Sequence, residues 1–139
     1  LNVRAMLLLM QQLAPAMQAG ASVLAISSEG AVRVMPFYGL VSASKAALEA
    51  ACRQLAVELA PRGIRVNVVS PGAVRTDAWQ ALPDADQRLA RAEAATPRGT
   101  LVSGEEVAAT AQFLLSDASS GITGQTIIVD GGARIRGSG

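Results

Sequence analysis

The 139-residue chain contains no histidine and a single cysteine, Cys52. Without histidine the chain cannot by itself supply a Ser-His-Asp mechanism, so acid–base chemistry would fall to Tyr, Lys, Asp or Glu. One thiol cannot form an internal disulfide, and a zinc site is not expected where histidine is absent. We therefore predict no metal site, and we interpret Cys52 as a small buried residue in a reducing compartment.

Charged residues (17%) and aromatic residues (3%) are also scarce, whereas apolar residues, many of them alanine, make up 50% of the chain. This composition favours helices packed closely on a sheet and argues against disorder. The net charge of +1 and the scattered arginines give no reason to expect nucleic acid or a membrane surface as a partner. No apolar run reaches the roughly 18 residues that span a bilayer, and no export signal is visible. We expect a cytoplasmic protein.

Apolar residues at helical spacing alternate along the chain with short apolar runs that are typical of buried strands. We predict helices at residues 2–18, 38–60 and 104–116, and strands at residues 22–27, 64–69 and 126–130. The more polar residues 75–100 contain short helical pieces. Alternation of strand and helix predicts parallel βαβ units, and therefore an α/β fold in which helices cover both faces of a doubly wound parallel sheet.

Polar residues follow the first two predicted strands, and open α/β sheets bind ligands at the carboxyl ends of their strands. Residues 27–28 (Ser-Ser) end the first strand, and residues 70–72 (Ser-Pro-Gly) follow the second. A helix start that carries Tyr38 and Lys45 comes after the first of these loops. We expect these groups to converge on one rim of the sheet.

Several ordered segments resemble the short-chain dehydrogenase/reductase family: SVLAISSEG, then Tyr38, SASKAALEA, LAVELAPRGIRVNVVSPGAVRT and ITGQTIIVDGG. The resemblance covers essentially the whole chain and implies a Rossmann-type domain. The glycine-rich loop that wraps a dinucleotide pyrophosphate does not occur in these residues. We therefore expect residues 1–139 to be a partial single domain, the C-terminal half of a Rossmann-type sheet whose N-terminal dinucleotide-binding half is absent.

The position of the tyrosine departs from the pattern of most of that family. Most members carry Tyr-x3-Lys, which would put tyrosine at position 41, but this chain has Val41 there and Tyr38-x6-Lys45 instead. This spacing is similar to that of the enoyl-acyl-carrier-protein reductase branch. The segment ISSEGAVRVMPFYGLVSASKAAL resembles the NADPH-dependent bacterial reductases of that branch. The resemblance implies NAD(P)H-dependent reduction of an enoyl thioester in fatty acid synthesis, with NADP as the expected cofactor and NAD as the alternative.

The spacing also has a physical interpretation. Seven residues is close to two helical turns, so Tyr38 and Lys45 would share a face if both were helical, about 10 Å apart along the axis rather than about 6 Å for a spacing of four. The phenol could then move toward the substrate and donate to a thioester oxygen on which negative charge develops. The positive charge of the lysine favours the phenolate form of the tyrosine.

The remaining site residues are assigned by resemblance. Lys45 would hold the ribose hydroxyls of the cofactor as well as act in catalysis with Tyr38. Ser28 lies 17 residues before Lys45, at the offset of the family's catalytic serine, and Asn2 matches a helix asparagine that helps to hold a water relay. The loop that contacts the nicotinamide, and hence the cofactor-binding set, is matched by Pro71, Gly72, Val74 and Thr76.

Each assignment has a simpler structural alternative. Ser28 could make a local turn bond, and Asn2 and Thr76 could each cap a helix. Trp79 either covers a substrate tunnel or only seals the lid above it. At the level of function, the alternatives are a short-chain carbonyl reductase or alcohol dehydrogenase that uses Tyr38, and a non-catalytic family member. The resemblance also implies a homo-oligomer, a tetramer or dimer, with the helix at 38–60 and the first helix as contact faces.

Overall fold

The computed structural model describes residues 2–76 and 84–135, so the alternatives given for Trp79 lie outside the described residues. Three parallel strands form one sheet in the order β1 (Ser22–Ile26), β2 (Arg65–Pro71) and β3 (Thr126–Val129). Ser22 pairs with Arg65, and Val68 pairs with Thr126. The three predicted strands and the α/β fold class are therefore confirmed, with strand ends that shift by one or two residues.

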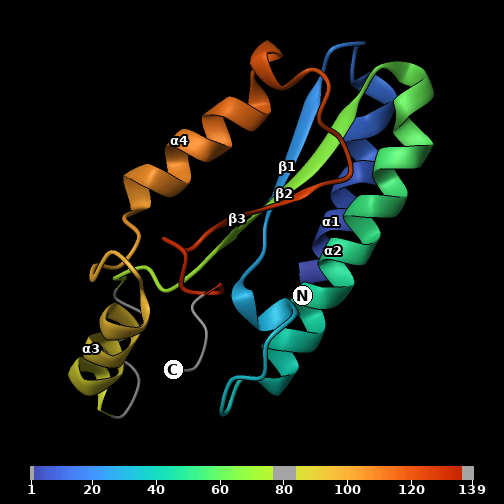
Figure 1. The fold of residues 1–139 in the computed structure, drawn as a ribbon. Coiled ribbons are helices and arrows are strands. Elements are labelled where there is room, and N and C mark those ends of the chain that lie inside the picture. The colour runs from blue at the N-terminus through green and yellow to red at the C-terminus, as the bar shows by residue number, and fades with distance from the viewer. Residues whose placement is uncertain (1, 77–83, 136–139) are drawn as a thin grey trace.

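Helices cover both faces of this sheet (Figure 1). Helices α1 (Asn2–Leu13) and α2 (Gly39–Leu59) lie side by side on one face, and α4 (Gly104–Leu115) lies on the other. Helix α3 (Ala85–Ala95) lies on the side toward which the strands end. The first predicted helix is shorter than expected because the chain turns into a short 3-10 helix, Ala14–Ala16, at Pro15, which has no backbone N–H to continue an α-helix.

The main core lies between the sheet and the α1–α2 layer. Its buried members come from α1, β1, α2, the turn before β2, and β2 itself: Met10, Ala25, Leu48, Cys52, Ala56, Leu59, Ile64, Val66 and Val68. Burial raises the pKa of the Cys52 thiol to about 11, so this thiol stays protonated at neutral pH and acts as a small apolar residue. The interpretation of Cys52 as a buried core residue is confirmed.

Helix α4 is fixed at both ends. At its start Ser103 and Glu106 form a capping box, and the Arg98 guanidinium beside Glu106 lowers the pKa of that carboxyl to about 2. At its end the Arg65 guanidinium, on β2, donates to the carbonyl oxygens of Leu114 and Ser116, each at 3.0 Å. These bonds satisfy carbonyls that a helix end leaves without intrahelical partners.

In residues 2–76 and 84–135 no helix is both long and apolar enough to cross a membrane. In the same residues no group of three or more His, Cys, Asp or Glu side chains is arranged to hold a metal ion.

Candidate active site

Lys45 lies in the second turn of α2 and reaches back to the end of β1. Its side chain is half-buried, and its Nζ donates to the carbonyl oxygen of Ile26 at 2.8 Å. Partial burial lowers the pKa of the Lys45 ammonium from its ordinary value, because desolvation disfavours the charged form. An ammonium has three N–H donors, so two remain for a ligand at the carboxyl rim of the sheet.

Tyr38 is the N-cap residue of α2, and the helix itself begins at Gly39. The φ of −112° and ψ of 7° at Tyr38 are not helical, so the predicted two-turn separation on one helix face applies only from Gly39 onward. The backbone carbonyl of Tyr38 accepts from Ser42 N at 2.7 Å, and its N–H donates to Met35 O at 3.2 Å. The backbone of Tyr38 is thus held by the preceding turn and by the first turn of the helix.

The ring of Tyr38 lies against Gly30, a buried residue of the loop after β1. A Cβ atom at Gly30 would lie 2.6 Å from both Cδ1 and Cε1 of the ring, closer than real Cβ atoms approach. The absence of a side chain at Gly30 is therefore what lets the phenol ring occupy this place.

The side chain of Ser28 is bonded to the backbone of Gly30 in the same cluster. Its Oγ accepts from Gly30 N at 3.2 Å and caps the short 3-10 helix Glu29–Ala31. The local turn bond given above as the simpler alternative is thus observed, and the half-buried hydroxyl stands two residues from the glycine that seats Tyr38. The structure brings Ser28, Gly30 and Tyr38 together on one loop, with Lys45 anchored to the strand that precedes it.

Asn2 is linked to the start of α2 rather than to the rim. Its Nδ2 donates to Ser44 Oγ at 2.9 Å, and Ser44 Oγ donates to Val41 O at 2.8 Å. Asn2 therefore ties the first turn of α1 to the residue that precedes Lys45. Val41, at the position of the common tyrosine, is 39% exposed.

The loop after β2 carries the predicted nicotinamide contacts. Gly72 N donates to Val129 O at 2.9 Å, and a Cβ at Gly72 would lie 2.8 Å from Asp130 Cβ and 3.0 Å from Glu29 Oε1. Val74 then forms a parallel bridge with Val102. Pro71 is half-buried at the end of β2, whereas Thr76 is exposed at the edge of the described segment. Gly72 is thus required for close packing of three loops at the rim.

Two residues of this site, Gly30 and Glu49, were not singled out from the sequence. Gly30 reads as a turn glycine, and only the geometry shows that it seats Tyr38. Glu49 is a buried carboxylate on α2 whose Oε1 accepts from Ser27 Oγ at 2.5 Å. Its signal was available: it lies four residues after Lys45 among alanines and leucines, and glutamate is rarely buried without a partner.

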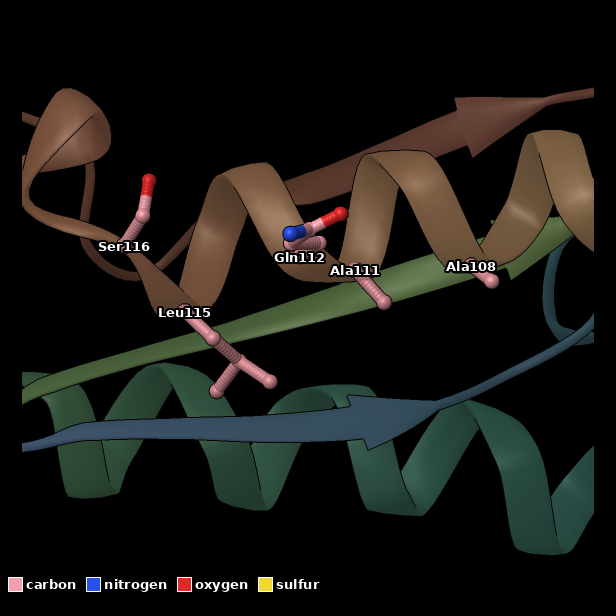
Figure 2. A pocket seen from close by; sticks show the side chains of 5 residues that line it. All are labelled: Ala108, Ala111, Gln112, Leu115 and Ser116. Carbon is pink, nitrogen blue, oxygen red and sulfur yellow. The ribbon is translucent and has the colours of Figure 1, made fainter.

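Two hollows differ in their relation to this cluster. The larger, of about 530 Å³, runs along α4 and is open to solvent (Figure 2). Its Leu115–Ser116 end lies near the start of β1, where Ser22 Oγ donates to Leu114 O, and therefore away from Tyr38 and Lys45. The smaller, of about 200 Å³, is lined by the loop after β1, Ala73, α3 and the tail: Glu29, Arg33, Val34, Met35, Ala73, Ala92, Ala95, Thr96 and Ala133. Met35 lines the smaller hollow, and its carbonyl oxygen accepts from the backbone N–H of Tyr38. The smaller hollow therefore lies beside the candidate site.

A parallel α/β sheet with a tyrosine and a lysine at its carboxyl rim fits the short-chain dehydrogenase/reductase class. A family model described as enoyl-(acyl carrier protein) reductase matches residues 1–134. The chain belongs to this family, in agreement with the resemblance inferred from its motifs.

Individual relatives are similar over most of the chain. It is 44% identical over 123 residues to the enoyl-[acyl-carrier-protein] reductase [NADH] of Synechocystis, covering 88% of this chain and 48% of that protein. It is 40% identical over 141 residues to the 1-cyclohexenylcarbonyl-CoA reductase of Streptomyces collinus, covering 97% of this chain and 49% of that protein.

Among solved structures, the enoyl-acyl carrier protein reductase of Bacillus cereus with NADP+ and indole naphthyridinone matches with a TM-score of 0.91. The two are 34% identical, and the match covers 98% of this chain and 53% of that one. The chain thus spans about half the length of the curated relatives and solved structures that it matches.

Proposed function

We propose that this chain forms the substrate side of an NAD(P)H-dependent reductase that reduces the double bond of an enoyl thioester in fatty acid synthesis. The observation that carries the proposal is the position of the tyrosine. Tyr38 lies against Gly30 at the start of α2, and valine stands at position 41, where most short-chain dehydrogenases have their tyrosine. Names of relatives in the same family, one acting on an acyl-carrier thioester and one on a CoA thioester, support a thioester substrate.

The donor groups present fit a nicotinamide dinucleotide. Lys45 would hold its ribose hydroxyls with the N–H donors that the bond to Ile26 leaves over, and the loop residues Pro71, Gly72, Val74 and Thr76 would lie against its nicotinamide. When bound, the dinucleotide supplies a hydride. We propose NADPH as the preferred form, on the resemblance of residues 26–48 to NADPH-dependent reductases. The B. cereus structure holds NADP+, whereas the Synechocystis relative is named for NADH.

Tyr38 would act as the proton donor. Its phenol would donate to the thioester oxygen and stabilise the negative charge that develops there during reduction. Ser28 would add a second hydroxyl at the same edge, and Asn2 would hold the first turns of α2 through Ser44.

The acyl chain would enter the hollow of about 200 Å³ beside Tyr38. Its walls are largely apolar, with Val34, Met35 and Ala73 on one side and alanines of α3 on the other. Such a surface suits a hydrocarbon chain, whose burial is favourable in proportion to the apolar area removed from water.

We further propose that the protein is a homo-oligomer, a dimer or tetramer, that works in the cytoplasm. The outward face of α2 exposes small and apolar residues, among them Ala43, Ala47, Ala50 and Val57, and Val57 is 72% exposed. Exposed small and apolar residues on one helix face are a candidate protein contact. The buried, unpaired thiol of Cys52 is consistent with a reducing compartment.

The test is a substrate panel with the full-length protein. With crotonyl-CoA and NADPH, we expect oxidation of the nicotinamide, which is measured as a loss of its absorbance. We expect a lower kcat/KM with NADH. Ketones and alcohols of similar size should react far more slowly. Activity on a ketone or alcohol without activity on the enoyl thioester would favour the carbonyl reductase alternative. The absence of any turnover would favour a non-catalytic member.

A further inference from the structure

Glu49 is a charged side chain in an apolar layer. It lies on the sheet-facing side of α2, between Leu48 and Cys52, and is only 7% exposed. Its Oε1 accepts from the hydroxyl of Ser27 at 2.5 Å, and Ser27 is itself only 4% exposed. Burying a carboxylate is unfavourable, and an apolar residue of similar volume at such a position is often as stable or more so. Packing of α2 therefore does not explain why a carboxylate is there.

Ser27, the hydrogen-bond partner of Glu49, directly precedes Ser28 in the chain. Ser27 N donates to Val69 O of β2 at 2.8 Å, so the backbone of Ser27 is held by the neighbouring strand and its hydroxyl by α2. One residue earlier, the carbonyl of Ile26 accepts from Lys45 Nζ. Lys45 and Glu49 are four residues apart on α2 and share a face. Two consecutive groups at the end of β1 are thus bound by two side chains one helical turn apart.

This arrangement links Glu49 to the reacting groups by a short path. Ser27 precedes Ser28, whose Oγ accepts from Gly30 N, and Gly30 seats the Tyr38 ring. A displacement of Ser27 would move Ser28 and the seat of the phenol, and would shift Ile26 O relative to Lys45. Small displacements of this kind matter, because a misplacement of about 1 Å can cost about 100-fold in rate.

We propose that Glu49 is a positioning residue for the Tyr38–Lys45 site: through Ser27 it fixes the end of β1 against α2, so that Ser28, Tyr38 and Lys45 keep their mutual geometry. This inference rests on the proposed function, since it assumes that these three residues act on substrate and cofactor. Glu49 itself touches neither.

The experiment compares Glu49→Leu, Glu49→Gln and Ser27→Ala in the full-length protein, with Glu58→Leu as the control. Glu58 is an exposed glutamate of the same helix whose carboxylate accepts from Gln54. Single turnovers of NADPH with crotonyl-CoA separate two quantities: the amplitude reports the fraction of competent protein, and the rate constant reports the geometry of that fraction. A thermal melt accompanies each variant.

We expect Glu49→Leu to lower the single-turnover rate constant by about 10- to 100-fold while the melting temperature stays near that of the unchanged protein. Glu49→Gln should retain most of the rate, because the amide oxygen can still accept from Ser27. Ser27→Ala should lower the rate constant as much as Glu49→Leu does. The double variant that combines Ser27→Ala with Glu49→Leu should lower it no further, because the two side chains act as one unit. Glu58→Leu should keep the original rate constant.

A wild-type rate constant in Glu49→Leu, with or without a lower amplitude, would overturn the proposal. If that variant does not fold, Ser27→Ala decides alone, and an unchanged rate constant there would have the same consequence. Should the unchanged protein fail to reduce crotonyl-CoA, the proposed function falls separately. The affinity for NADPH then decides the role of Glu49: a roughly tenfold weaker Kd in Glu49→Leu is expected, and an equal Kd would contradict it.

Discussion

At the scale of single residues, the site depends on an absent side chain as much as on the groups that are present. The Tyr38 ring occupies space that a Cβ at Gly30 would fill, and Ser42 Oγ lies 3.1 Å from the same point. The backbone of Gly30 does not have a positive φ, so an alanine there would meet no backbone strain. The main effect of adding a methyl group at Gly30 is therefore displacement of the phenol, with a smaller displacement of the Ser42 hydroxyl.

Gly30→Ala should therefore reduce enoyl-thioester turnover by about 10- to 100-fold, because the proton donor moves away from the substrate oxygen. The matched control is Gly39→Ala. A Cβ at Gly39, also without a positive φ, meets nothing within 4 Å, and alanine at a compatible site stabilises by about 0.4–1 kcal/mol. Steady-state kinetics and thermal melts of both variants check this. Equal turnover in the two variants would show that the ring is not seated by Gly30.

Tyr38 and Lys45 could be found from the sequence because their spacing is a linear pattern. The roles of Gly30 and Glu49 could not be predicted in this way, although the apolar neighbours of Glu49 indicated that it is buried, because both roles depend on contacts across a loop or across the sheet–helix layer. A glycine between Glu29 and Ala31 indicates a turn, whereas its contact with Tyr38 requires the path of the whole loop. Ser28 follows β1, and its Oγ accepts from Gly30 N, which is the local turn bond named as its simpler alternative. Its catalytic role stays a prediction.

At the scale of elements, the alternation of strand and helix was sufficient to predict the sheet and its helices. The boundaries were less certain, since local signals compete at element ends. The strand predicted for residues 64–69 begins at Arg65 and extends to Pro71, because pairing with β3 continues through the Pro71–Val129 pair. Helix α2 begins at Gly39 rather than Tyr38, because Tyr38 adopts the cap conformation.

One arginine of β2 makes several bonds to the end of α4. The Arg65 guanidinium donates to carbonyl oxygens at the end of α4 and to Ser119 Oγ. We expect Arg65→Met to lower the free energy of unfolding by about 2–3 kcal/mol, because hydrogen bonds from a charged group contribute about 1.5–3 kcal/mol. The hydroxyls of Ser22 and Ser119 would remain as donors to the same carbonyls. Urea denaturation of the full-length protein measures it.

Arg53→Met is the control for that experiment, since Arg53 is exposed on α2 and surface changes usually stay within about 0.5 kcal/mol. If Arg65→Met is as stable as Arg53→Met, the end of α4 is held by its buried Leu114 and not by the arginine.

At the scale of the whole molecule, we propose that the chain supplies the substrate side of the site. It spans about half the length of its relatives, and the glycine-rich phosphate loop is not among its residues. Its outer α2 face carries exposed alanines that would let a second helix approach closely. The exposure of that face is a property of the fold that the sequence predicted only through the family resemblance.

We expect Ala47→Arg, in the middle of that face, to convert the assembled protein into a smaller species in sedimentation velocity, because a charged side chain would be buried without a partner in the contact. Gln87→Arg, on the exposed side of α3, should leave the assembly unchanged. An identical sedimentation coefficient for Ala47→Arg and the unchanged protein would exclude this face as the contact.

We propose that Tyr38, displaced from the common position by three residues, donates the proton in enoyl-thioester reduction. The most direct measurement is the rate of NADPH oxidation with crotonyl-CoA in the full-length protein and in its Tyr38→Phe variant. Loss of the phenolic hydroxyl should lower kcat by about 100- to 10,000-fold, the usual contribution of a general acid, while the Kd for NADPH stays within about twofold because Lys45 is intact. An unchanged kcat in Tyr38→Phe would contradict the account and leave no role for the phenol.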